Sequence, residues 1–247
     1  MKLISKTFNL IKPILPKFHG NRSYSSIAAE ALDPFQEEEL KKKLIVVNEN
    51  DEMIRTDTKY NCHRVVNGKI PLHRAFSVFI FNSKNEILLQ QRASCKVTFP
   101  DHVTNACCSH PLYNTYVYRD NLQAMGACVS RRLWFELGIP RDEFSTGNLK
   151  FITKIHYFSK GDGKWGEHEI DYLFVLHKDL TVMPNEMEVK RVWSVPRDEF
   201  DSFIKKCEYP LTPWFAEIKK EWLFKMWDNL NNLDSIRDNK IHKYITQ

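Results

Sequence analysis

The segment 75–81 places the strongest limit on how this chain can fold. It reads Ala-Phe-Ser-Val-Phe-Ile-Phe and is apolar at every position except Ser77. Because successive side chains of a strand point to opposite faces, such a run predicts a strand that is buried on both faces. A strand of this kind needs a packed layer on each side of its sheet. We therefore expect an α/β fold, of the α+β kind, with a mixed β-sheet sandwiched between helices.

The other segments supply further strands and helices for the same domain. Apolar residues at three- to four-residue spacing over 118–137, followed by Gly138, predict the longest helix. No internal repeat or linker interrupts residues 34–235, so we expect a single domain over 30–247. Strands are expected over 44–47, 75–81, 86–91, 149–158, 167–177 and 187–195, with 86–91 returning along 75–81 as its hairpin partner. Helices are expected over 34–43, 118–137, 196–206 and from 212 onward.

The positive charge of the chain is concentrated at its N-terminus. The sequence carries 36 Lys and Arg against 31 Asp and Glu, a formal net charge of +5. Residues 1–29 contain five of the basic residues and no acidic one, so the remainder is formally neutral. A neutral body argues against a nucleic-acid-binding surface. The apolar runs also fall short of the roughly 20 residues that a membrane-spanning helix needs.

Residues 1–29 have the composition of a targeting segment. They are basic, contain hydroxyl side chains, lack acids and are interrupted by Pro13 and Pro16. This composition is typical of an organelle transit peptide, and we expect mitochondrial targeting. A disordered basic tail without an address is the alternative, with a cytoplasmic or peroxisomal location. The C-terminal Ile-Thr-Gln is not the peroxisomal SKL-type address.

The cysteines do not form a pattern that indicates disulfides or a zinc finger. None of the six belongs to a CxxC pair, and two of them are adjacent in sequence. We therefore expect free thiols in a reducing compartment. The six are Cys62, Cys95, Cys107, Cys108, Cys128 and Cys207.

The stretch 104–113, Thr-Asn-Ala-Cys-Cys-Ser-His-Pro-Leu-Tyr, combines a thiol with an imidazole. If it is extended, Cys108 and His110 share one face and Cys107 points to the other. One face then carries a nucleophile or proton carrier beside a metal ligand. The alternative is a buried pair of cysteines that ends a strand at Pro111, because free cysteine is often buried.

Three histidines and two glutamates lie at or near the ends of predicted strands. Glu167 and Glu169 are two residues apart and share a strand face, with His168 on the opposite face. Three imidazoles with two carboxylates suit an octahedral or nearly octahedral divalent metal. For each histidine alone, an ordinary hydrogen-bonded loop or core position is the alternative. The candidate ligands are His63, His73, His110, Glu167 and Glu169.

Four basic side chains lie near these candidate ligands or on the long predicted helix. Together they could bind a phosphate or diphosphate group. Solvated surface charges are the alternative. The four are Lys59, Arg92, Lys96 and Arg132.

The end of the long helix is similar to the closing part of a Nudix box. That pattern normally supplies several carboxylates that hold a metal, which activates water on a diphosphate. Here Arg132 and Phe135 replace two of the glutamates, and only Glu136 remains. The sequence therefore predicts a Nudix-like fold without the usual hydrolase site.

Four motifs in a fixed order make the resemblance specific. From about residue 57 onward the chain resembles the type I isopentenyl-diphosphate isomerases of the Nudix superfamily. Such an enzyme converts isopentenyl diphosphate to dimethylallyl diphosphate by adding and removing a proton through a tertiary carbocation. The motifs are Leu-His-Arg-Ala-Phe-Ser over 72–77, Thr-Asn-Ala-Cys-Cys-Ser-His-Pro over 104–111, Trp-Gly-Glu-His-Glu-Ile-Asp-Tyr over 165–172, and Thr-Pro-Trp over 212–214.

The resemblance implies a role for each candidate residue. It implies Cys108 and Glu169 as the two proton carriers, with Tyr157 and Trp214 beside the hydrocarbon. It implies a Mg²⁺ ion that arrives with the diphosphate and is held by Glu136, and a second divalent ion (Mg²⁺, Mn²⁺ or Zn²⁺) in the His3Glu2 site. The implied metal ligands are His63, His73, His110, Glu136, Glu167 and Glu169, and the implied diphosphate-binding residues are Lys59, Arg92, Lys96 and Arg132.

The chain also departs from that family. Asp101 stands where a glycine is usual, and Val103 stands where an aromatic residue is usual; Asp tolerates left-handed backbone geometry less well than Gly. A Nudix-type hydrolase and a catalytically weakened or non-catalytic isomerase relative are the alternatives. The expected partner is a small prenyl diphosphate, with no nucleic acid and no membrane span, and the expected state is a monomer.

Overall fold

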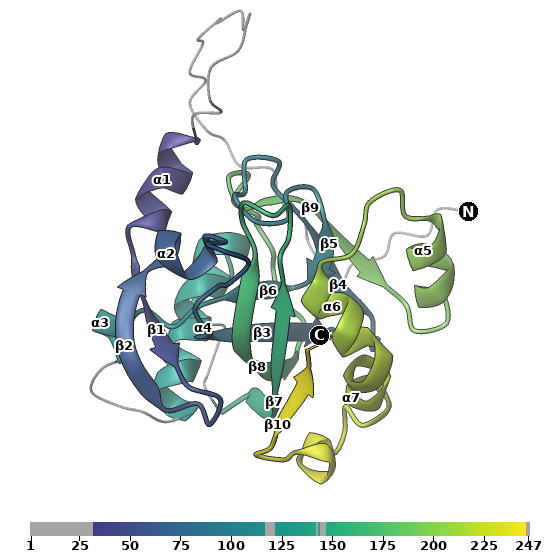
Figure 1. The fold of residues 1–247 in the computed structure, drawn as a ribbon. Helices are drawn as coiled ribbons and strands as arrows, with labels where there is room; N and C mark the ends of the chain where they lie inside the picture. Colours follow the sequence, from purple (N-terminus) through teal and green to yellow (C-terminus); the bar gives the residue numbers. More distant parts are fainter. Residues whose placement is uncertain (1–31, 117–121, 142, 144–146, 246–247) are drawn as a thin grey trace, which may run out of the picture.

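The computed structural model describes residues 32–116, 122–141, 143 and 147–245, and Figure 1 shows how its elements are arranged. The strands are β1 (Lys43–Val47), β2 (Met53–Thr58), β3 (His73–Phe81), β4 (Ile87–Arg92), β5 (Val103–Asn105), β6 (Cys107–Ser109), β7 (Leu149–Ser159), β8 (Glu167–His177), β9 (Val189–Val195) and β10 (Ile241–Tyr244). The α-helices are α1 (Pro34–Leu40), α2 (Lys59–His63), α3 (Tyr113–Tyr116), α4 (Leu122–Leu137), α5 (Phe200–Lys206), α6 (Pro213–Ile218) and α7 (Phe224–Asp228).

Strand β3 forms the centre of the sheet, as its apolar run predicts. All nine of its residues are buried. It pairs in parallel with β8 along its whole length, from His73 opposite Glu169 to Phe81 opposite His177. The sheet runs in the order β10-β7-β8-β3-β1-β2, with both parallel and antiparallel pairs. The expected mixed sheet is confirmed.

The expected hairpin between 75–81 and 86–91 is confirmed at its turn, but it does not extend along the two strands. Strand β4 meets β3 only through Phe81 and Ile87, and then diverges to pair with β5 and β9. The middle of β3 pairs instead with β6, which places Ser77 opposite Cys108. The short turn after β3 favours pairing of the two segments that it connects. Strand β4 instead pairs over most of its length with β5 and β9, which come later in the chain.

Two apolar clusters cover the two faces of the sheet. Alternate residues of β3 divide between them: Val78 packs on the side of α4, and Phe79 packs on the side of α6 and α7. The predicted apolar face of α4 lies in the first cluster, at Leu122, Met125, Val129, Leu133 and Leu137. The second face also carries His73, Ser77 and Cys108 at the end of the strands, since these positions alternate with the core residues.

Several element boundaries differ from the predictions. Residues 196–199 precede α5 as a turn, so the helix begins at Phe200 and not at Pro196. The last predicted helix is divided by a π-helical turn over Lys219–Leu223, between α6 and α7. Strands β2 and β10 and helix α2 have no clear periodic pattern in the sequence, and they were not predicted.

The loop before β5 has left-handed backbone geometry at Asp101, where the sequence has an aspartate in place of the usual glycine. Asp101 has a φ of 61°, which lies in the left-handed region where a glycine would be least strained. Its carboxylate accepts a hydrogen bond of 2.8 Å from Ser94 and pairs with Lys190 at 2.7 Å. These contacts hold the turn despite the missing glycine.

The predicted leader, 1–29, lies outside the described residues. Within the described part of the chain, no helix is long and apolar enough to cross a membrane.

Candidate active site

Side chains from distant parts of the chain line one cavity at the end of β3 and β8. All the predicted site residues border it except His73 and Glu136, which lie directly behind it. His73 contacts Glu169, and Glu136 pairs with Arg132. The lining residues are Lys59, His63, Arg92, Lys96, Thr98, Cys108, Ser109, His110, Arg132, Tyr157, Glu167, Glu169 and Trp214.

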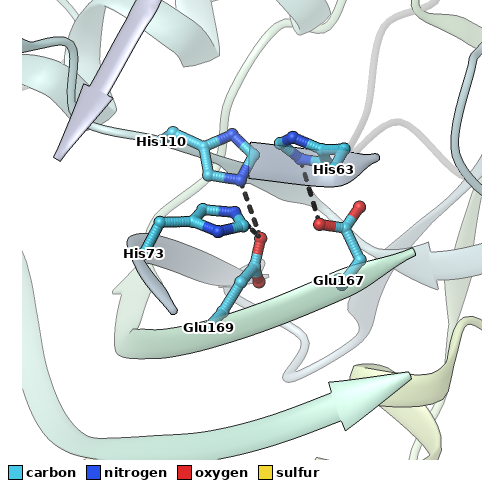
Figure 2. A group of neighbouring side chains, drawn as sticks. All are labelled: His63, His73, His110, Glu167 and Glu169. Carbon is cyan, nitrogen blue, oxygen red and sulfur yellow. Dashed lines mark hydrogen bonds and ion pairs between the residues drawn. The ribbon is translucent and has the colours of Figure 1, made fainter. Parts of the chain in front are cut away.

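The five predicted ligands of a divalent metal meet in what we call the His/Glu cluster (His63, His73, His110, Glu167 and Glu169). One ligand atom from each lies within 4.8 Å of all the others, and all five residues are buried. Figure 2 shows the side chains pointing toward one another. Their closest contacts are 2.7 Å from His110 Nε2 to Glu169 Oε1 and 3.0 Å from His63 Nε2 to Glu167 Oε2.

Backbone carbonyl groups orient two of these imidazoles for metal binding. Nδ1 of His63 lies 2.7 Å from the carbonyl of Lys59, and Nδ1 of His73 lies 2.9 Å from that of Pro71. A carbonyl only accepts, so each Nδ1 donates and each Nε2 presents a lone pair. Each buried Nε2 faces a carboxylate of the cluster: that of His63 lies 3.0 Å from Glu167, and that of His73 lies 3.5 Å from Glu169. Imidazole nitrogens and carboxylates that face one another in this way fit a divalent metal ion between them.

Strand pairing explains why distant ligands converge. His73 on β3 lies opposite Glu169 on β8, and Glu167 is two residues earlier on the same face. The chain after β6 brings His110 to this edge, and the last residue of α2 is His63. The cluster therefore depends on the parallel β3–β8 pair.

The sulfur of Cys108 is surrounded by polar groups. Trp214 Nε1 donates to it at 2.9 Å, and the amide oxygen of Asn105 accepts from it at 3.0 Å. Burial, followed by the charge of Asp171, raises the pKa of Cys108 to about 12. Cys107 points to the opposite face and packs in the cluster under α4. The structure therefore places the two cysteines as their strand alternation predicts.

The carboxylate of Glu169 contacts the hydroxyl of Tyr157 as well as the imidazole of His110. The hydroxyl of Tyr157 donates to Glu169 Oε2, on the side away from His110. Burial and the neighbouring charge of Glu169 raise the pKa of Tyr157 well above its ordinary value, so this hydroxyl remains protonated. Burial opposes ionisation of Glu169, but His73 and Tyr157 outweigh it and hold the carboxyl pKa below its usual range.

Three of the predicted diphosphate-binding residues form what we call the cation cluster (Lys59, Lys96 and Arg132). Burial, with the charges of the other two cations, lowers the pKa of Lys59 to about 8. Glu188 lies 2.5 Å from Lys96 and 3.2 Å from Arg132. Three cations that share one cavity offer the hydrogen-bond donors that a diphosphate needs, and Glu188 already pairs with two of them.

Arg92 is placed differently from the cation cluster. Its Nε and Nη2 donate to the carbonyl of Thr98, and Nε also donates to that of Phe99. Its Cζ lies 5.4 Å from the ring centroid of Trp214. In this structure Arg92 holds the loop that borders the cavity, and its contact with a diphosphate stays a prediction.

Sequence reasoning missed three carboxylates around the cavity. Glu188 and Glu39 contact Arg132, at 3.2 and 3.5 Å. No periodicity in the sequence indicates these pairs. Asp171, by contrast, continues the alternation of Glu167 and Glu169 along β8, so the same two-residue spacing could have identified it.

Comparison with known proteins agrees with this geometry. The NUDIX domain family matches residues 71–215. Isopentenyl-diphosphate Delta-isomerase 1 of Mesocricetus auratus is 46% identical over 219 residues, covering 86% of this chain and 96% of that protein. Isopentenyl-diphosphate delta-isomerase 2 of Homo sapiens is 40% identical over 226 residues, covering 89% and 99%. DR0079 of Deinococcus radiodurans shares the fold, with a TM-score of 0.51 at 15% identity over 73% of this chain and 99% of that one.

The matched region runs from β3 to the first residues of α6 and contains most of the cavity, so the fold is that of the Nudix superfamily. Within that superfamily, the chain belongs to the family of isopentenyl-diphosphate isomerases. The resemblance found in the sequence motifs is confirmed.

Proposed function

We propose that this chain converts isopentenyl diphosphate to dimethylallyl diphosphate, with Cys108 and Glu169 as the two proton carriers. The observation that carries the proposal is their placement in one buried cavity that also holds a metal-binding cluster and a cation cluster. Moving the double bond requires one proton to be delivered to carbon and another to be removed. A buried thiol and a buried, ionised carboxylate supply one proton and one acceptor.

Tyr157 and Trp214 support these proton transfers. Tyr157 donates to Glu169 and so holds one carboxylate oxygen in place. Trp214 donates to the Cys108 sulfur, and its ring lies 6.2 Å from that of Tyr157 and 5.5 Å from that of Phe99. An aromatic wall excludes water from a tertiary carbocation, and a ring face contributes about 0.5 to 2 kcal/mol to a neighbouring cation.

The cation cluster orients the substrate by its diphosphate group. Lys59, Lys96 and Arg132 would bind phosphate oxygens, and Arg92 borders the same loop. Holding the unreactive end in this way places the hydrocarbon between the proton carriers. Glu136, which pairs with Arg132, would hold a Mg²⁺ ion that accompanies the diphosphate.

The His/Glu cluster would hold the second divalent ion, which we propose to be Mg²⁺, Mn²⁺ or Zn²⁺. A bound ion would supply positive charge that keeps Glu169 ionised and fixes its orientation. Two imidazoles held by Lys59 and Pro71 carbonyls, together with two carboxylates, need little rearrangement to accept such an ion.

The test is an assay that follows two products at once. Purified protein with Mg²⁺ and either Mn²⁺ or Zn²⁺ is given isopentenyl diphosphate, and dimethylallyl diphosphate and free phosphate are measured together. We expect isomer without phosphate release, and a loss of at least about 10³-fold in kcat for Cys108→Ala. Cys128→Ala is the matched control, because this cysteine is also buried but packs in the apolar cluster under α4 and does not line the cavity.

Other outcomes would overturn the proposal. Phosphate release without isomer would indicate a Nudix-type hydrolase. Neither product from folded, metal-loaded protein would indicate a non-catalytic relative. Full activity in Cys108→Ala would remove this thiol from the mechanism.

We also propose that residues 1–29 address the chain to mitochondria and that 30–247 acts as a monomer. The acid-free basic composition of 1–29 supports the address. Cell fractionation of the chain with and without residues 1–29 tests the first statement, and light scattering of the purified protein tests the second. An unchanged location after removal of 1–29, or a dimeric mass, would contradict them.

A further inference from the structure

Ser77 is the one polar residue of the apolar run 75–81 in β3, and it contacts the sulfur of Cys108. Its Oγ lies 3.3 Å from Cys108 Sγ and 2.7 Å from Asp171 Oδ2. The three residues belong to adjacent strands: Ser77 on β3 is paired with Cys108 on β6, and Asp171 is on β8. Ser77 and Asp171 are each 1% exposed. A buried chain of polar atoms therefore leads from the sulfur into the centre of the sheet.

Nothing in the packing of this face requires these two polar residues. The neighbouring positions on the same face of β3 and β8 are the core residues Phe79 and Leu173. Among the described residues Asp171 has no ion-pair partner, and its Oδ1 has no hydrogen-bond partner. Burying a carboxyl group without a counter-ion costs stability, so an apolar pair would suit the fold better.

The geometry instead suits the holding of a thiol. A serine hydroxyl has one proton and two lone pairs, so it can donate to Asp171 while its oxygen faces the sulfur. Asn105 and Trp214 contact the same sulfur at 3.0 and 2.9 Å. Thr104 Oγ1 lies 3.8 Å from it, and Ser77 adds a further contact, which limits rotation of the Cys108 side chain about its Cα–Cβ bond. The position of the sulfur relative to the substrate is thereby fixed.

We propose that Ser77 is a positioning residue for Cys108 and that Asp171 holds the Ser77 hydroxyl in place. This inference rests on the proposed role of Cys108 in the isomerisation. Ser77 and Asp171 do not touch the diphosphate-binding residues in the structure. Their loss should therefore reduce turnover and leave substrate binding nearly unchanged.

The first test is the change in kcat and KM for Ser77→Ala. We expect kcat to fall roughly 10- to 100-fold, because a displacement of about 1 Å in a reacting group can cost about 10²-fold. We expect KM for isopentenyl diphosphate to stay within about twofold, since the cation cluster is intact. A smaller folded fraction would also lower the apparent kcat without changing KM, so turnover is expressed per folded molecule, as measured by circular dichroism.

Thr153→Val is the matched control. Thr153 on β7 also has a buried hydroxyl, which donates to the carboxylate of Asp238 at 2.6 Å, and it has no contact with Cys108. The control therefore loses a similar hydrogen bond from the same sheet. We expect a comparable loss of stability with kcat unchanged.

Asp171 is tested by a conservative and a truncating variant. Asp171→Asn keeps an oxygen that can accept from Ser77, and it should retain most of the turnover. Asp171→Ala removes that acceptor and should lower kcat nearly as far as Ser77→Ala. The kcat of the double variant Ser77→Ala/Asp171→Ala should then be little lower than that of Ser77→Ala alone. Both changes break the same chain of contacts from Asp171 through Ser77 to Cys108.

A second readout separates this inference from the proposed function. The rate of alkylation of Cys108 by iodoacetamide, followed by mass spectrometry of its peptide, reports the position of the sulfur without substrate. We expect Ser77→Ala to change this rate several-fold and Thr153→Val to leave it unchanged. If the wild-type chain lacks isomerase activity but the rates still differ, the proposed function fails and the positioning role stands.

Unchanged kcat and an unchanged alkylation rate in Ser77→Ala would overturn the inference. Additive losses in the double variant would overturn the role of Asp171. An equal effect of Thr153→Val would show that general loss of stability, and not the position of the sulfur, explains the result.

Discussion

The His/Glu cluster and the cation cluster share one cavity, but their charged groups are satisfied in different ways. In the His/Glu cluster, Nε2 of His63 lies 3.0 Å from Glu167, and Nε2 of His73 lies 3.5 Å from Glu169. In the cation cluster, the single guanidinium of Arg132 contacts Glu39, Glu136 and Glu188. The first group brings imidazole nitrogens and carboxylates together without a buried Lys or Arg between them, and in the second group the cations are already paired with carboxylates.

This difference indicates how each group meets its ligand. A metal ion would complete the His/Glu cluster, since it would give the imidazole nitrogens and carboxylates the positive charge that they lack. A diphosphate has to compete with carboxylates for Arg132. A Mg²⁺ ion that binds both Glu136 and the diphosphate would reduce this competition, because it provides a new partner for the displaced carboxylate. The four variants below test this comparison, beginning with the largest expected effect.

Glu169→Gln should have the largest effect, because it removes a metal ligand and a proton carrier together. We expect kcat to fall by about 10³-fold or more and bound metal per chain to decrease. Steady-state turnover and elemental analysis measure the two effects. His168→Gln is the control, since His168 faces away from the cluster and contacts the carbonyl of Ile70. Retained metal and turnover in Glu169→Gln would contradict the assignment.

Arg132→Ala should have the next largest effect. It leaves three buried carboxylates without their shared cation, and removing one partner of a buried ion pair typically costs about 3 to 5 kcal/mol of unfolding free energy. We expect KM to rise more than kcat falls, as urea unfolding and steady-state kinetics would show. Arg132→Lys keeps the charge without the planar guanidinium and should be intermediate. Unchanged KM in both variants would exclude Arg132 from diphosphate binding.

Glu188 should make stability depend on pH in the acid range. Burial disfavours its charged form, but Lys96 and Arg132 outweigh this and lower its pKa to about 2 from an ordinary value of 4.5. A carboxyl group with a lowered folded-state pKa stabilises the fold above the unfolded pKa, and this stabilisation is lost as pH falls toward the folded pKa.

The measurement is the urea midpoint of wild type and Glu188→Gln between pH 7 and about pH 3. We expect the variant to be less stable at pH 7 and the difference to shrink as pH falls below about 4.5. A difference that stays constant through this range would show that the charge of Glu188 is not the cause.

Glu39→Gln should have the smallest effect. Glu39 pairs with Lys42, and its Oε2 lies 3.5 Å from Arg132, a long contact made from the short helix α1. Removing this competing charge should lower KM by about twofold, and loss of the pair with Lys42 should cost about 1 kcal/mol of unfolding free energy. Glu38→Gln on the same helix is the control, because its exposed side chain pairs only with Lys41. A raised KM in Glu39→Gln would mean that Glu39 assists substrate binding.

The sequence predicts well the parts of this molecule that depend on local patterns. The apolar run of β3, the long helix α4 and the two-residue alternation of Glu167 and Glu169 each follow from spacing alone. The same alternation places Cys108 in the cavity and Cys107 in the core. These features need no knowledge of what lies across the sheet.

Contacts between distant segments could not be predicted in the same way. Lys96 and Glu188 are 92 residues apart, and no periodicity connects them. The role of Ser77 depends on which strand lies beside β3, and the hairpin prediction chose the wrong neighbour there. Propensity and pattern describe one segment at a time, whereas the pairing of strands is decided by the burial of the whole sheet.

The His/Glu cluster cannot be completed during synthesis until β8 has been made and has paired in parallel with β3. His63, His73 and His110 leave the ribosome before Glu167 and Glu169 have been made. The growing chain thus presents imidazoles without their carboxylates until β8 emerges and pairs with β3. Long-range parallel pairs form slowly, because a long loop must close first. A chain in which all five residues bind one ion has therefore been synthesised through β8 and has folded.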